Sequence, residues 1–166
     1  MKAHPGGANS PLDAPFSVRR GDYEITTDRS RMDLDVIHGV LTKSYWAEGI
    51  PRETVERSLA GALCFALLER GALIGFARVI TDAATFAYLS DVFVIPEARG
   101  DGLGKWLIDV VLTHPALAGL RRFVLVTRDA QMLYGRFGFK PLAHPERFME
   151  IVRPDVYRQT SFQDRE

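Results

Sequence analysis

A glycine-rich turn between an apolar strand and a helix constrains this chain more than any other feature. Residues 92–95 are Val-Phe-Val-Ile, Pro96 stops the run, and Arg-Gly-Asp-Gly-Leu-Gly follows at 99–104. Apolar residues from Leu103 onward then recur at helical spacing. Glycine reaches positive φ without steric cost, and the first amides of a helix lack intrahelical partners. This unit can therefore hold a phosphate or pyrophosphate, and a tight turn with no ligand is the alternative.

Two well-known phosphate loops do not match this turn. A Walker loop ends in Gly-Lys-Ser/Thr, which the segment lacks. A dinucleotide-binding fingerprint requires a third glycine at the position of Lys105, and it follows the first strand of its fold. The strand before this turn comes late in the chain, so another kind of phosphate site is favoured.

The remaining hydrophobic pattern predicts a mixed α/β (α+β) domain built around a sheet. Strands are expected over 23–27, 63–69, 73–80, 85–95 and 122–127, with two short final strands over 139–142 and 147–152. Helices are expected over about 33–45, 51–60, 103–113 and 130–137. We expect residues 1–20 to be a flexible tail, 21–155 to form the domain and 156–166 to be a second tail.

Composition limits the partners and the compartment. Lys plus Arg and Asp plus Glu number 21 each, so the chain lacks the basic field of a general nucleic-acid binder. No stretch approaches the roughly 18 apolar residues of a membrane span, and the first ten residues lack a signal-peptide core. A single cysteine, Cys64, fits a reducing compartment. The four histidines lack metal-ligand spacing. We expect a cytoplasmic protein without nucleic acid, membrane or metal.

Two motifs bracket the third predicted helix and the strand after it. The first is Arg/Gln-x-x-Gly-x-Gly/Ala, matched by Arg99, Gly102 and Gly104. The second is Leu-Tyr-x-x-x-Gly-Phe, matched by Leu133, Tyr134, Gly138 and Phe139. Together and in this order they resemble the GNAT superfamily of acyl-CoA-dependent N-acetyltransferases. The resemblance implies a mostly antiparallel central sheet, flanked by helices and splayed between the family's fourth and fifth strands, here near 88–95 and 122–127.

The resemblance also implies acetyl-CoA as the cosubstrate. The turn would bind the pyrophosphate through backbone amides, and the strand before it would pair with the pantetheine arm. The residues implied are Val92, Phe93, Val94, Arg99, Gly100, Asp101, Gly102, Leu103, Gly104, Lys105, Thr127 and Phe137. Thr127 departs from the family, because many members carry asparagine at that position.

Attack of an amine on a thioester requires loss of a proton from the amine and protonation of the departing thiolate. The resemblance implies Tyr134 as the proton donor. Asp91, beside the expected pantetheine strand, is the candidate base, with a structural aspartate as the alternative. The segment with Tyr45, Trp46 and Glu48 borders the acceptor site in this family, so the resemblance implies that these residues bind the amine, together with Tyr88 of the strand. For the first two of these, packing in the core is the alternative.

In this family the splay follows from a bulge in the strand before the glycine turn, so the resemblance implies a bulge in the strand over 85–95. Strict alternation would put Tyr88, Ser90 and Val92 on one face and Asp91 and Phe93 on the other. A bulge would reset that phase, and the sequence leaves both arrangements open.

The expected activity is transfer of an acetyl group from acetyl-CoA to a primary amine by direct attack on the thioester. One alternative is a non-catalytic acyl-CoA-binding or sensing module. Another is a regulatory domain whose glycine turn binds a nucleotide. A homodimer is implied by the family alone.

Overall fold

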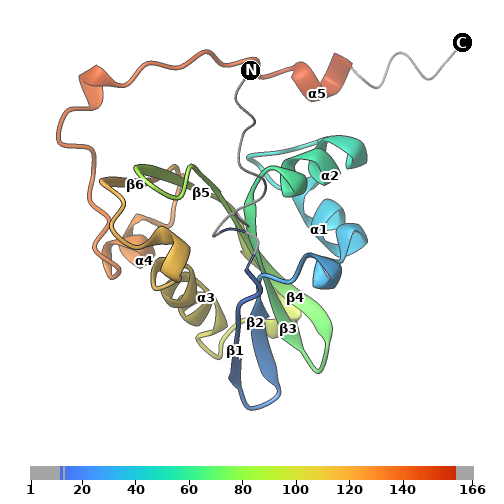
Figure 1. The fold of residues 1–166 in the computed structure, drawn as a ribbon. Coiled ribbons are helices and arrows are strands. Elements are labelled where there is room, and N and C mark those ends of the chain that lie inside the picture. Colours follow the sequence, from blue (N-terminus) through green and yellow to red (C-terminus); the bar gives the residue numbers. More distant parts are fainter. Residues whose placement is uncertain (1–11, 13, 160–166) are drawn as a thin grey trace, which may run out of the picture.

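A six-stranded sheet runs through the molecule in the order β1-β2-β3-β4-β5-β6 in the computed structural model, which describes residues 12 and 14–159 (Figure 1). The strands are β1 (Ser17–Arg20), β2 (Tyr23–Thr26), β3 (Leu63–Glu69), β4 (Ala72–Thr81), β5 (Phe86–Val94) and β6 (Arg122–Leu125). Neighbouring strands are antiparallel except β5 and β6, which are parallel. The predicted mixed, mostly antiparallel sheet is confirmed.

Helices cover both faces of the sheet (Figure 1). They are α1 (Leu34–Leu41), α2 (Arg52–Ala60), α3 (Leu103–Leu112), α4 (Gln131–Gly135) and α5 (Val156–Gln159). Alternate strand residues supply two apolar clusters, one on each face. Phe65 of β3 packs in the cluster under α3, which we call the α3 cluster. Phe76 of β4 packs in the cluster under α1 and α2, which we call the α1–α2 cluster.

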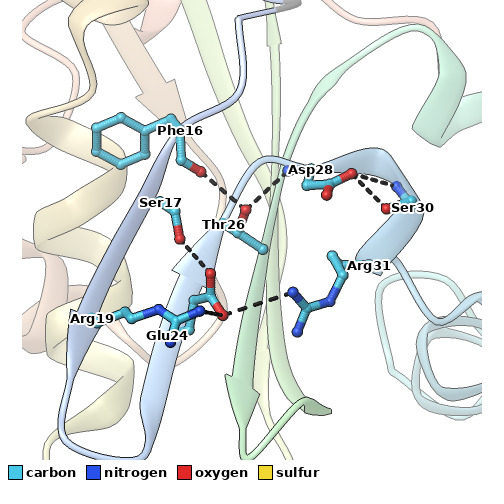
Figure 2. A network of polar contacts seen from close by, with 8 residues as sticks. All are labelled: Phe16, Ser17, Arg19, Glu24, Thr26, Asp28, Ser30 and Arg31. Atoms are coloured by element: carbon cyan, nitrogen blue, oxygen red, sulfur yellow. Dashed lines mark hydrogen bonds and ion pairs between the residues drawn. The ribbon is translucent and has the colours of Figure 1, made fainter.

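The first strand lies inside the predicted N-terminal tail, so the tail boundary at residue 20 is wrong. β1 pairs with β2 along its whole length. Thr26 donates its hydroxyl to the carbonyl of Phe16 at 3.0 Å, and Glu24 binds two side chains of β1 and the guanidinium of Arg31 (Figure 2). Polar side chains connect β1 to its neighbours, and β1 lacks an alternating apolar pattern. Hydrophobic periodicity therefore does not predict this strand. Residues 1–11 of the predicted tail lie outside the described residues.

The two final strands predicted over 139–142 and 147–152 are not formed. These residues belong to an extended segment that contains only a short 3-10 turn, Pro145–Arg147. Strand propensity alone does not make a strand, because each strand needs a hydrogen-bonding partner. Further on, Tyr157 in α5 packs against the α1–α2 cluster.

Candidate active site

A bulge in β5 opens the sheet. Asp91 and Val92 together face the single residue Ala77 of β4, and Asp91 adopts a left-handed φ of +53°. Pairing between β5 and β6 joins residues 86–89 to 122–125 and stops before the bulge. Beyond that point the two parallel strands separate, which confirms the predicted splay and leaves a cleft between them.

The bulge also resets the side-chain phase of β5. Before it, Ala87 and Leu89 pack in the α3 cluster. After it, Val92 and Val94 face that same cluster, whereas Phe93 packs in the α1–α2 cluster. Strict alternation would have placed Phe93 with Leu89. Of the two arrangements that the sequence allowed, the structure therefore has the one in which a bulge changes the side-chain phase.

A hollow of about 710 Å³ lies where β5 ends and α3 begins. Nine residues predicted to bind CoA line it: Val92, Phe93, Val94, Arg99, Gly100, Gly102, Leu103, Gly104 and Lys105. It is also lined by Trp46, Ala98, Ile108, Asp129, Ala130, Leu133 and Tyr134. Three predicted residues do not line this hollow: Asp101, Thr127 and Phe137.

The glycine turn presents free backbone donors to this hollow. Gly100 and Gly102 adopt φ values of +112° and +73°, which favour glycine. The first intrahelical hydrogen bond of α3 is donated by Trp106 to the carbonyl of Gly102, and the N-terminus has no side-chain cap. The amides of residues 103–105 therefore point out of the helix end without an intrahelical acceptor. Arg99 donates its Nε to the carbonyl of Val94 at 2.8 Å and closes the turn.

A second hollow of about 350 Å³ lies on the other side of the bulge. Tyr45, Trp46 and Tyr88, predicted to bind the acceptor, line it together with Asp91 and Thr127. The rest of its wall is formed by Leu89, Ser90, Val92, Leu125, Val126, Arg128, Asp129, Ala130 and Tyr134. Glu48 is exposed and does not line it. The two hollows share Trp46, Val92, Asp129, Ala130 and Tyr134, so they adjoin each other.

The linker after α1 is tied to β5 and to the loop that follows β6. The predicted helix over 33–45 ends at Leu41, and the following turns carry Tyr45 and Trp46 over the cleft. Trp46 donates its Nε1 to Oδ1 of Asp91 at 3.1 Å. The hydroxyl of Tyr45 accepts from the amide of Arg128 at 3.2 Å, and that guanidinium lies 3.9 Å from the ring centroid. Both aromatic side chains remain nearly half exposed, at 49% and 44%, so they are wall residues rather than core residues.

Asp91 is held by a second buried partner that sequence reasoning missed. Arg78 of β4 donates its Nε to Oδ2 of Asp91 at 2.6 Å, and the two side chains are 15% and 7% exposed. Each carboxylate oxygen of Asp91 thus already accepts a hydrogen bond. The available signal was a single charged residue inside the apolar run 73–80, since a buried charge requires a partner.

Tyr134 lies where the two hollows meet. Its ring packs edge to face on Phe139 at 5.9 Å, and its hydroxyl has no hydrogen bond to any residue between 14 and 159. Burial raises the pKa of Tyr134 above its ordinary value, and the nearby Tyr45 phenol raises it further. At neutral pH the phenol is therefore protonated and able to donate. Phe137, predicted to pack near the thiol end of CoA, lines neither hollow.

Comparisons with known proteins agree with this geometry. Residues 60–141 match the acetyltransferase (GNAT) domain family. A candidate acetyltransferase from Gibberella zeae is 32% identical, over 74% of this chain and 81% of that protein. The crystal structure of a candidate GNAT-family acetyltransferase from Xanthomonas campestris pv. campestris is 48% identical. It superposes with a TM-score of 0.80 over 81% of this chain and 96% of that one.

The chain belongs to the GNAT acetyltransferase family. A more distant structure shares the fold alone, a predicted acetyltransferase with acetyl-CoA from Clostridium acetobutylicum. It is 16% identical, with a TM-score of 0.57 over 78% of this chain and 94% of that one. In the part of the chain that the structure describes, no helix has the length and apolar character to cross a bilayer. The same residues contain no group of three or more His, Cys, Asp or Glu side chains placed to hold a metal ion.

Proposed function

We propose that this protein transfers the acetyl group of acetyl-CoA to a primary amine. One observation supports this above all: a protonated tyrosine, Tyr134, lies between a hollow with free helix amides and a hollow walled by aromatic rings. The helix amides and the glycine turn suit a pyrophosphate. Lys105 lines the same hollow and adds a positive charge.

The chemistry balances with the groups present. The amine nitrogen bonds to the thioester carbon, the carbon–sulfur bond breaks, and the thiolate takes the proton of Tyr134. The amine nitrogen releases a proton in the same reaction, so the phenol is restored through solvent. A backbone amide at Val92 or Phe93, beside the bulge, would stabilise the oxyanion that forms on the carbonyl.

For Asp91 we propose a positioning role instead of the role of base. An amine proton would compete for the carboxylate with the Arg78 guanidinium 2.6 Å away and with the Trp46 indole. The carboxylate instead fixes Trp46 on the acceptor side and ties the bulge to β4. Asp91→Asn should therefore raise the KM for the amine more than it lowers kcat. A large fall in kcat at unchanged KM would identify Asp91 as the base.

Titration calorimetry with acetyl-CoA tests the cosubstrate site. Gly102→Ala should weaken acetyl-CoA binding, because its φ of +73° strains any side chain in the turn. Gly119→Ala is the matched control: its φ is +77°, a Cβ there also meets nothing within 4 Å, and it lies outside the site. ATP and NAD should give no heat. Tight ATP or NAD binding without acetyl-CoA binding would support a nucleotide-binding regulatory domain instead.

Turnover tests catalysis separately from binding. Thiol release from acetyl-CoA with a panel of primary amines should fall about 10²–10⁴-fold in Tyr134→Phe, with acetyl-CoA affinity unchanged. Wild-type protein that binds acetyl-CoA but consumes none with any amine would instead be an acyl-CoA-binding module.

A further inference from the structure

The smaller hollow, of about 350 Å³, which we call the acceptor hollow, contains two charges that no buried partner neutralises. Of the described residues that line it, three carry a charge: Asp91, Arg128 and Asp129. Asp91 is neutralised by Arg78 at 2.6 Å, and both of those side chains are largely buried. The side chains of Arg128 and Asp129 are 64% and 67% exposed. These two residues therefore set the charge that an acceptor meets.

The Arg128 guanidinium is held in place while its hydrogen-bond donors stay free. It lies 3.9 Å from the ring centroid of Tyr45, and the backbone amide of Arg128 donates to the Tyr45 hydroxyl at 3.2 Å. A guanidinium on an aromatic face keeps the N–H groups at its edge available for an oxyanion. Its side chain donates no hydrogen bond to any residue between 14 and 159, because the Asp129 carboxylate lies 3.6 Å away, beyond hydrogen-bond distance.

The two charges occupy different places in the site. Asp129 lines both hollows, as Tyr134 does, whereas Arg128 lines the acceptor hollow alone. The carboxylate therefore lies on the side where the amine nitrogen must reach the thioester, and the guanidinium lies on the side away from the cosubstrate. An amine in this hollow meets a negative group beside its nitrogen and a positive group beyond it.

We propose that the acceptor is a small primary amine that carries an oxyanion, a carboxylate or a phosphate, a few atoms from its nitrogen. This inference rests on the proposed acetyl transfer. Asp129 binds the ammonium group before it loses its proton, and Arg128 binds the oxyanion through the parallel N–H donors of its guanidinium. The volume of the hollow, about 350 Å³, is near the lower limit for ligand pockets, which suits a molecule of amino-acid size.

The same arrangement disfavours a polyamine as the acceptor. The second ammonium group of a diamine would lie beside the Arg128 guanidinium, and like charges repel each other at short range. Asp129 attracts the ammonium group of any primary amine, so it does not distinguish one amine from another. Arg128 is therefore the residue that determines which amines are preferred.

Thiol release from acetyl-CoA with matched acceptors tests this preference. Glycine, β-alanine and 4-aminobutanoate are each compared with their own amides, and O-phosphoethanolamine is compared with ethanolamine. The kcat/KM of the best acidic acceptor should exceed that of its neutral counterpart by about 10–100-fold, as expected for hydrogen bonds to a charged group. The carboxylate and phosphate pairs show which oxyanion is bound. The diamine 1,4-diaminobutane should be a poorer acceptor than 4-aminobutanoate.

Two arginine variants assign the preference to one side chain. In Arg128→Gln the ratio of kcat/KM between acidic and neutral acceptors should fall by about 10–100-fold. Arg136→Gln is the matched control and should keep the ratio, because Arg136 is exposed at the end of α4 and lines neither hollow. Acetyl-CoA affinity, measured by calorimetry, should be unchanged in both variants, which shows that they fold. In Asp129→Asn the KM should rise for acidic and neutral amines alike.

The possible failures of this inference and of the proposed function can be told apart. Neutral amines acetylated as efficiently as acidic ones, or a preference that survives Arg128→Gln, would overturn the inference and leave acetyl transfer intact. The absence of thiol release with every amine would contradict the proposed function, and the inference would fall with it.

Discussion

Among single residues, His114 combines burial with an unsatisfied ring nitrogen. Its Nδ1 accepts the amide of Ala116 at 3.2 Å, and the ring packs on Phe16 at 4.7 Å and Phe65 at 5.4 Å. Its Nε2 is buried without a hydrogen-bond partner among the described residues. Burial lowers the pKa of His114 below 6.5. The folded protein therefore holds this ring neutral between two aromatic rings.

This lowered pKa predicts an acid-sensitive fold. Below the unfolded-state pKa of about 6.5, the unfolded chain binds the proton before the folded one does. The free energy of unfolding should therefore fall as the pH drops through that value, by at most about 1.4 kcal/mol per pH unit from this group. Urea unfolding at about pH 7.5 and about pH 5.5 measures it. His114→Asn should reduce the pH dependence, and the exposed His144→Asn should not.

The Arg78–Asp91 ion pair is largely buried, and each of its charges depends on the other. Removing one partner leaves the other buried and uncompensated, so Arg78→Met should cost about 3–5 kcal/mol in the free energy of unfolding. The double variant Arg78→Met/Asp91→Asn should lose less than the sum of the two single changes. The exposed pair Arg70–Asp22 provides the control, because Arg70→Met should have little effect. If Arg78→Met and Arg70→Met lowered the free energy of unfolding equally, burial would not explain the cost of removing Arg78.

At the scale of elements, the long strands and helices follow from periodicity alone. β3 has the bounds predicted from its apolar run, and α3 agrees to within a residue. Periodicity does not reveal elements that depend on side-chain hydrogen bonds or on a partner strand. β1 is missed because polar side chains hold it to β2. Residues 147–152 are wrongly predicted as a strand because no neighbouring strand pairs with them. The glycine turn was predictable because Gly100 and Gly102 adopt positive φ values that favour glycine, so the conformation is visible in the sequence.

Close packing of β4 between β3 and β5 gives a prediction at this scale. A Cβ on Gly75 would lie 2.9 Å from Cδ2 of Leu67 and 3.0 Å from the carbonyl oxygen of Phe93. That oxygen belongs to a strand backbone next to the bulge and cannot move freely. Gly75→Ala should therefore lower the melting temperature. Gly39→Ala in α1 meets nothing within 4 Å and should raise it slightly. Thermal unfolding followed by circular dichroism compares them.

For the whole molecule, the sheet divides two apolar clusters and the cleft lies between its separated strands. The family and the general position of the site could be predicted from two motifs. The Arg78–Asp91–Trp46 contacts could not, because they join three elements distant in sequence, and only the fold brings them together. Likewise, the contact between Tyr45 and Arg128 connects residues 83 positions apart.

Ligand binding should be visible in the stability of the entire fold. A ligand that binds only the folded state raises the free energy of unfolding by mass action, by about 2.7 kcal/mol at a hundredfold excess over its Kd, and the melting temperature rises with it. Acetyl-CoA should raise the melting temperature of wild-type protein and of Gly119→Ala, but much less that of Gly102→Ala. An equal shift in all three would place acetyl-CoA outside the glycine turn.

The cleft exists because β5 carries one residue more than its neighbour β4 can pair. Side chains of a strand alternate between the two faces of the sheet. One extra residue therefore exchanges the faces for every residue that follows it in β5. A chain shortened by one residue at position 91 or 92 could resume the ladder, seal the gap beside β6 and become a more regular sheet. It would then lose the cleft in which we propose that acetyl-CoA and the amine meet. One extra residue in β5 therefore interrupts the regular pairing of the sheet and keeps the cleft open.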